Sequence, residues 1–261
     1  MFKYIGIRGH RGAGKKTISY LLGNAIETIL EKSDWDTKWP QLIDDVESDN
    51  FEEHLNLNHV YFDSFADTLF VMIHTLLNIP MDWMTDDFMK DHVYINMKDF
   101  SYINCDKLDQ TPLPLYTCKE LFQERYNEID TETRPRTFRT DTFLTLREFI
   151  YYFGFTMQSF FGLNTWVKSL DRNKGLLEKF YADNRTIYKI FIDVKYPSEA
   201  TYIKDNGGII IKCMRPDNIK EDTPVSTELD FDSRVDHEIS YENIRDLKDT
   251  IYNIANELIY G

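Results

Sequence analysis

The sequence contains few cysteines and no long apolar run. Its three cysteines, Cys105, Cys118 and Cys213, are scattered without Cys-x-x-Cys spacing, so they imply neither a disulfide framework nor a zinc site. No run of about 18 apolar residues and no signal peptide stands out, so we expect no membrane association and no targeting segment. These absences favour a protein of the reducing cytoplasm.

Basic residues are also scarce relative to acidic ones. The chain has 30 Lys and Arg against 44 Asp and Glu, which gives a formal net charge of −14 at pH 7. A general nucleic-acid-binding surface needs clustered Lys and Arg to neutralise phosphates, so this balance argues against one. A small anionic ligand is still compatible with the negative net charge, because a few basic residues in a cleft can make the local potential positive.

The stretch from Tyr4 to Leu22, YIGIRGHRGAGKKTISYLL, carries the strongest motif. A short apolar strand is followed by Gly-x-x-x-x-Gly-Lys, from Gly9 to Lys15, and then by an amphipathic helix, which is the order of a phosphate-binding loop. Glycines let backbone N–H groups converge on phosphate oxygens, and the helix N-terminus adds partial positive charge. The alternative is a turn that merely joins strand to helix, but the spacing and placement favour nucleotide binding.

One departure from the commonest form of this loop narrows the class of protein. Lys16 stands where a Ser or Thr usually holds Mg²⁺, and Thr17 follows one place later. A hydroxyl at the later position is typical of nucleoside monophosphate kinases. The residues expected to bind ATP here are Gly9, Gly12, Ala13, Gly14, Lys15, Lys16 and Thr17.

Strands alternate with helices along most of the chain. Apolar spacing predicts strands over 4–7, 60–62, 187–192 and 209–211, and helices over 18–32, 67–77, 145–160, 197–204 and 243–259. Thr145 and Glu148 form a capping-box pattern at the start of one helix. The stretch 33–59 is polar and acidic, which is typical of a surface excursion, and periodicity is poor over 81–141, as in a lid, a binding insertion or disorder.

This order of elements predicts an α/β fold. With 261 residues the chain can bury roughly 70–75% of its unfolded surface, enough for one domain over 1–261. We expect a three-layer α/β/α P-loop kinase fold with a central parallel sheet and a poorly structured helical or lid insertion over about 81–141. Ligands bind beyond the carboxyl ends of such strands, which brings the loop, 63–67 and Asp193 to one edge.

Several blocks, in the same order, resemble the deoxynucleoside monophosphate kinases of bacteriophages and related viruses. They are GHRGAGKKT, SFADTLF followed by NIP, TLREFIYYFG with a downstream Trp166, and IDVKYPSEATYIKDNGGIIIKCMRP. The resemblance covers most of the chain except 33–58 and about 98–141. It implies Mg²⁺-dependent transfer of the γ-phosphoryl of ATP to a (deoxy)nucleoside 5′-monophosphate for viral DNA synthesis, in the host cytoplasm. A homodimer is left open.

The resemblance also implies roles for single residues. Lys15 and Arg11 would stabilise the transferred phosphate, Arg147 would bind the acceptor phosphate, and Arg215 would pack on the donor adenine. Asp67 would orient substrate, Trp166 would wall the acceptor base, and Thr17 and Asp193 would serve Mg²⁺. Simpler alternatives are a solvated loop arginine for Arg11, helix or turn capping for Asp67 and Asp193, and a core position for Trp166.

Departures from the family pattern keep other functions open. Lys16 replaces an expected acidic residue, Lys195 an expected Arg, and Phe155-Thr156 an expected Thr-Glu. On a helix, Lys16 faces about 100° away from Lys15, so we expect it to point to solvent. The alternative is that Lys16 binds the acceptor phosphate and shifts the substrate preference. The alternatives are a P-loop kinase that acts on a modified base or end in DNA, and a non-catalytic nucleotide-binding or structural protein.

Overall fold

The described part of the chain forms two compact units. The computed structural model describes residues 1–10, 12–48, 57–96, 102–104, 143–161, 165–170, 185–214 and 234–261. Unit 1 consists of Met1–Phe65 with Val167–Gly261, and unit 2 of Ala66–Trp166. The chain, for which we expected one domain over 1–261, thus contains two units, and each has buried apolar clusters of its own.

Unit 1 is built on a five-stranded sheet in which every pair of neighbours is parallel. The strand order is β2-β6-β1-β7-β8. The bounds are β1 (Phe2–Arg8), β2 (Val60–Asp63), β6 (Ile187–Phe191), β7 (Ile209–Met214) and β8 (His237–Ser240). The parallel central sheet expected from the apolar runs is therefore confirmed, while β8 was not predicted.

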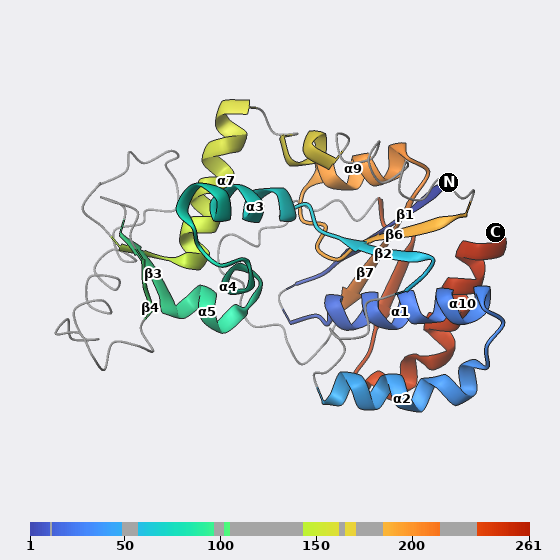
Figure 1. The fold of residues 1–261 in the computed structure, drawn as a ribbon. Helices are drawn as coiled ribbons and strands as arrows, with labels where there is room; N and C mark the ends of the chain where they lie inside the picture. The colour runs from blue at the N-terminus through green and yellow to red at the C-terminus, as the bar shows by residue number, and fades with distance from the viewer. Residues whose placement is uncertain are drawn as a thin grey trace. The chain divides into compact units, whose positions relative to one another are not determined.

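Helices cover both faces of this sheet (Figure 1). Ile5 and Ile7 of β1 belong to a cluster with α1 (Lys15–Leu30) and α10 (Lys248–Tyr260), whereas Tyr4 belongs to a cluster with α9 (Pro197–Asp205). Alternate residues of a strand point to opposite faces, so β1 has a helix layer on each side. The three-layer α/β arrangement is confirmed.

The stretch expected to be a polar excursion contains a helix, α2 (Trp35–Glu47). The side chain of Asp34 caps it by accepting a hydrogen bond from the N–H of Asp36 at 3.1 Å. Its buried residues are Trp35, Trp39, Leu42 and Ile43. The prediction was wrong because these few apolar residues have i, i+4, i+7, i+8 spacing, which places them on one face.

Unit 2 combines helices with a small antiparallel sheet of order β4-β3-β5. The elements are α3 (Asp67–Leu77), α4 (Met81–Thr85), α5 (Asp87–His92), β3 (Val93–Asn96), β4 (Tyr102–Asn104), β5 (Phe143–Thr145) and α7 (Leu146–Phe161). The described part of 81–141 is thus ordered, because Met84, Val93 and Ile95 are fully buried. Elements of three to six residues are too short to show a period in the sequence.

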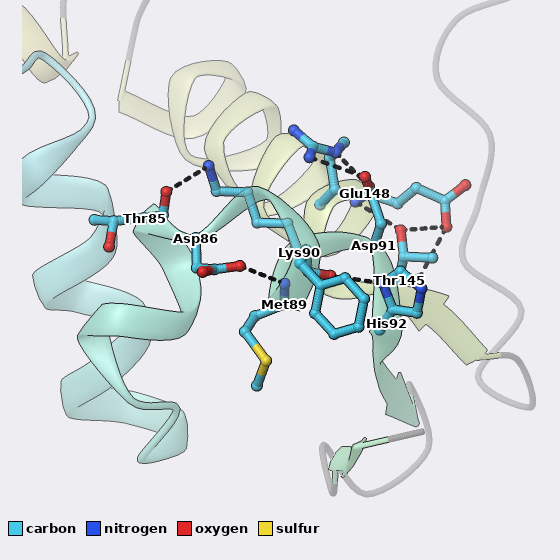
Figure 2. A network of polar contacts seen from close by, with 10 residues as sticks. Thr85, Asp86, Met89, Lys90, Asp91, His92, Thr145 and Glu148 are labelled. Carbon is cyan, nitrogen blue, oxygen red and sulfur yellow. Dashed lines mark hydrogen bonds and ion pairs between the residues drawn. The ribbon is translucent and has the colours of Figure 1, made fainter. Parts of the chain in front are cut away.

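Helix ends agree closely with the sequence analysis. The Thr145 N–H donates to Glu148 Oε2 at 3.0 Å, and the Glu148 N–H donates to Thr145 Oγ1 at 3.2 Å, which confirms the capping box (Figure 2). The C-terminal helix expected over 243–259 is present as the 3₁₀ turn η6 (Ile244–Leu247) followed by α10. Near the end of α3, the side chain of Leu76 is 64% exposed.

The burial of α2 can be tested with Trp39→Ala. Trp39 packs in the core of unit 1 with its ring 5.2 Å from that of Trp35. We expect the variant to lower the free energy of unfolding by about 3–5 kcal/mol, the usual cost of truncating a buried aromatic side chain. Urea unfolding measures this cost, with Gln41→Ala on the exposed face of α2 as the control. Equal, small losses in both variants would contradict the packing of α2.

Candidate functional site

The glycine-rich loop leaves the sheet at its topological switch point. β1 and β7 are neighbours, but β1 leads to β2 at one edge of the sheet and β7 leads to β8 at the other. In open parallel sheets, ligands bind outside the carboxyl ends of strands where the connections diverge in this way. The loop from Gly9 to Gly14 starts at this point, and α1 follows it directly.

Two glycines hold the loop close to β7 and to the residue after β8. Gly9 has φ 151°, and a Cβ there would lie 2.5 Å from the carbonyl oxygen of Cys213. Gly14 has φ 80°, and a Cβ there would lie 1.9 Å from Tyr241 Oη. Both positions therefore require glycine for space as well as for conformation. The glycines that the motif identified are structurally necessary where they stand.

Lys15 folds back onto the loop. Its Nζ donates to the carbonyl oxygens of Gly9 at 2.6 Å and His10 at 2.9 Å. This fixes an ammonium group against a loop at the N-terminus of a 16-residue helix, where partial positive charge favours anions. Lys16 is exposed, as we expected, and Thr17 in the next position is half-buried.

Tyr241 supports the loop and was missed by the sequence analysis. It follows β8, its side chain is buried, and its hydroxyl donates to the carbonyl oxygen of Ala13 at 3.4 Å. Its own N–H donates to the carbonyl oxygen of Met214 at the end of β7, also at 3.4 Å. A single tyrosine after a four-residue strand gives no sequence signal of such a contact.

Positive charge gathers next to the loop despite the acidic composition. Arg8, the last residue of β1, is buried, and Lys212 of β7 is its register partner. Register partners in a parallel pair point to the same face, so the two cationic side chains leave the sheet on one side. Lys212 also lies 3.6 Å from Glu238 Oε1 of β8. Local charge of this kind suits an anionic ligand.

The ends of β2 and β6 carry a second polar cluster. Ser64 Oγ donates to Asp193 Oδ1 at 2.8 Å, and Lys195 Nζ lies 3.4 Å from Asp193 Oδ2. Asp193 follows β6, so its expected place beyond the carboxyl end of a central strand is confirmed. Asp63, at the end of β2, accepts a hydrogen bond from the N–H of Ser64 at 2.8 Å.

A buried lysine stands beneath this cluster. Lys189, in the middle of β6, forms an ion pair with Asp63, and the side chains are only 4% and 8% exposed respectively. Lys189 Nζ also lies 5.6 Å from the ring centroid of Tyr61 and 5.1 Å from that of Phe191. A buried charge needs such a partner because it has lost its water. The sequence analysis missed this ion pair. The lysine inside the otherwise apolar strand sequence IYKIF was the feature that could have indicated a buried charge.

Glu199 stabilises the turn that contains Lys195 through hydrogen bonds to its backbone. Its Oε2 accepts hydrogen bonds from the N–H groups of Lys195 at 2.6 Å and Tyr196 at 2.9 Å. The pKa of Glu199 is raised to about 7, because burial and, to a lesser extent, the charge of Asp193 outweigh the lowering effect of the two amide donors and of Lys195. Both amides donate to the same carboxylate oxygen, Oε2.

The oxygen groups at this edge fit magnesium only in the presence of phosphates. Among the described residues, no group of three or more His, Cys, Asp or Glu side chains is placed to hold a metal ion. Mg²⁺ commonly takes one or two carboxylates and completes its shell with water and substrate phosphate oxygens. The carboxylate of Asp193 and the hydroxyl of Thr17 are oxygen ligands of the required kind.

In unit 2, Arg147 binds a carboxylate through two hydrogen bonds. Its Nε donates to Asp91 Oδ1 at 2.5 Å and its Nη2 to Asp91 Oδ2 at 3.1 Å. Arg147 lies in the first turn of α7 and Asp91 near the end of α5. The fork that we expected to hold a phosphate therefore holds a side-chain anion, and this contact fixes the plane of the guanidinium.

The other predicted site residues of unit 2 have positions that a structural role explains. Trp166 is 6% exposed and belongs to the apolar cluster of this unit, which favours the core alternative. Asp67 is exposed at the first position of α3, next to its N-cap Ala66, where a carboxylate complements the helix dipole. Arg11 and Arg215 lie outside the described residues.

Comparison with known proteins assigns the chain to no family. No protein-family model matches this sequence, and no curated protein matches it. Within the described ranges, no helix is long and apolar enough to cross a membrane. The motifs and the geometry of the loop therefore carry the functional proposal.

Glu199 makes a testable contribution to pH dependence. Its folded-state pKa is raised from 4.5 to about 7, so its contribution to stability is present below pH 4.5 and lost as the pH rises through 7. At 1.36 kcal/mol per pKa unit, this loss is roughly 3 kcal/mol. Glu199→Gln keeps an oxygen acceptor for both amides and cannot ionise.

The measurement is urea unfolding in metal-free buffer from pH 4 to pH 8. We expect the unfolding free energy of the wild type to fall relative to Glu199→Gln across this range. Curves for the two proteins that run parallel at all pH values would show that Glu199 does not titrate as its burial implies.

Proposed function

We propose that the protein is a Mg²⁺-dependent kinase that transfers the γ-phosphoryl group of ATP to a (deoxy)nucleoside 5′-monophosphate. The observation that carries this proposal is the loop between β1 and α1. It has the spacing of a phosphate-binding loop, it leaves the sheet at the topological switch point, and the Lys15 ammonium is fixed against it. The resemblance to viral deoxynucleoside monophosphate kinases supports the same reaction.

In the proposed reaction, unit 1 binds the donor. The loop amides and Lys15 bind the phosphates of ATP, and the N-terminus of α1 adds its dipole. Phosphoryl transfer needs little covalent chemistry from the protein, so fixed positive charge and alignment supply most of the rate enhancement. Lys15 suits this requirement because its ammonium is oriented by two carbonyl oxygens of the loop.

Asp193 and Thr17 are the proposed groups that serve Mg²⁺, which would neutralise phosphate charge when bound. Asp193 presents Oδ2 toward Lys195, whose side chain is 56% exposed. An exposed ammonium can move away from a carboxylate at small cost. We therefore propose that Lys195 can exchange its contact with Asp193 for one with a phosphate of the nucleotide.

Arg147 is the proposed ligand of the acceptor phosphate. The contact with Asp91 uses Nε and one hydrogen of Nη2, which is one edge of the guanidinium. A guanidinium fork also matches two oxygens of a phosphate. Under this proposal Asp91 orients the arginine, and the guanidinium binds the acceptor phosphate.

The test is a turnover screen of all common ribo- and deoxyribonucleoside monophosphates with ATP and Mg²⁺. The proposal predicts formation of a diphosphate from at least one of them. Labelled phosphate in duplex DNA but not in any mononucleotide would favour a polynucleotide acceptor. Tight ATP binding without turnover would favour a non-catalytic nucleotide-binding protein, and either result would contradict the proposal.

The first variant to examine is Lys15→Ala. Lys15 contacts charge that builds up during transfer, so its loss should lower turnover by on the order of a hundredfold or more. The thermal unfolding midpoint should change little, since the side chain is only half-buried and its ammonium bonds to loop carbonyls, one of them exposed. Lys38→Ala on α2 controls for the loss of one positive charge. Near wild-type turnover in purified Lys15→Ala would exclude the loop from catalysis.

A second pair of variants addresses the acceptor. Arg147→Lys should raise the acceptor KM nearly as much as Arg147→Ala, because a point charge cannot replace a two-hydrogen-bond fork. Initial rates at saturating ATP give this KM directly. If all three proteins shared the same acceptor KM, Arg147 would have only the structural role of binding Asp91.

A further inference from the structure

A continuous chain of polar contacts links the interior of the sheet to Asp193. Lys189 pairs with Asp63, Asp63 accepts from the N–H of Ser64, and Ser64 Oγ donates to Asp193 Oδ1. Lys189, Asp63 and Ser64 are all buried, whereas the Asp193 side chain is 20% exposed. This series of polar contacts thus runs from a buried ion pair to a carboxylate at the open edge of the sheet.

The buried end of this chain is held in place from several sides. β2 and β6 are hydrogen-bonded neighbours in which Tyr61 is the register partner of Lys189, and Asp63 that of Phe191. The Ile192 N–H continues this pairing by donating to the Asp63 carbonyl oxygen at 3.2 Å. A buried ion pair has few alternative arrangements, because any other would leave a charge without a partner. Asp63 is therefore a fixed acceptor for the backbone of Ser64.

At the outer end of this series of contacts, the two oxygens of the Asp193 carboxylate have different surroundings. Asp193 Oδ1 accepts from a buried serine, while Oδ2 lies 3.4 Å from the Nζ of Lys195, which is largely in solvent. One carboxylate oxygen is thus fixed to the interior and the other is directed outward. Outer contacts of this type orient metal-binding carboxylates in other proteins.

We propose that Ser64 is a positioning residue that orients Asp193 so that Oδ2 faces the Mg²⁺ bound with ATP. This inference rests on the proposed function for the identity of the ligand. Ser64 contributes no charge and need not touch ATP. Its hydroxyl determines the rotamer of Asp193, and the Lys189–Asp63 pair fixes the position of that hydroxyl.

The variant that tests this is Ser64→Ala, which removes the hydroxyl and keeps the backbone N–H that Asp63 accepts. Thr28→Val is the matched control, because it removes a buried hydroxyl that donates to the Asn24 carbonyl oxygen at 2.6 Å within α1. Ser64→Cys, with nearly the same volume and a weak S–H donor, is a second variant in case the first one unfolds.

The first measurement is binding of a non-hydrolysable ATP analogue by calorimetry, once with Mg²⁺ and once with EDTA. In Ser64→Ala we expect the gain in affinity from Mg²⁺ to shrink by about tenfold, in line with the loss of an outer contact to a metal ligand. Affinity in EDTA should match the wild type. A smaller gain should also appear in Ser64→Cys, and Thr28→Val should keep the full gain.

The second measurement is a crystal structure of Ser64→Ala without nucleotide, which tests positioning without reference to ATP. We expect the Asp193 carboxylate to rotate from its wild-type position. An unchanged carboxylate, or an unchanged gain from Mg²⁺, would overturn the role of Ser64. If the wild type itself bound no ATP analogue, the proposed function would fail, and the crystal structure alone would decide whether Ser64 positions Asp193.

Discussion

The close approach between the glycine-rich loop and the ends of β7 and β8 is the constraint on which the site depends. At Gly9 the backbone lies so near the Cys213 carbonyl that no side chain fits, and at Gly14 the space belongs to the Tyr241 hydroxyl. The loop is therefore supported by the sheet edge before any ligand binds. A preorganised loop needs little rearrangement to bind phosphate, which is what the proposed phosphoryl transfer requires.

Charge is arranged differently at the two ends of this site. At the loop, Lys15 bonds to backbone carbonyls, and the cationic side chains of Arg8 and Lys212 leave neighbouring strands on one face. At the ends of β2 and β6, two carboxylates each pair with a lysine, Asp63 with Lys189 and Asp193 with Lys195. An acidic chain thus concentrates cations where phosphate is expected and oxygen ligands where magnesium is expected. Burial also raises the pKa of the Cys213 thiol to about 12, which leaves it unreactive beneath the loop.

The sequence predicted the elements whose signals are local. The loop, the capping box of Thr145 and Glu148, and the apolar strands β1, β6 and β7 all have short-range patterns, and each lies where we expected it. α2 was missed because its few apolar residues stand among many polar ones. The pairing of Arg147 with Asp91, 56 residues apart, and the contact of Tyr241 with Ala13 depend on tertiary structure and leave no pattern in sequence.

The central claim is that the loop from Gly9 to Gly14, together with the first turn of α1, binds the phosphates of ATP. Amide chemical shifts from NMR test it most directly, in titrations with ATP and Mg²⁺ and separately with adenosine. We predict large shifts for the amides of Gly12, Gly14 and Lys15 with ATP and none with adenosine, because in the proposed complex these N–H groups face phosphate oxygens and not the nucleoside. Loop amides that respond equally to both ligands, or to neither, would contradict the account.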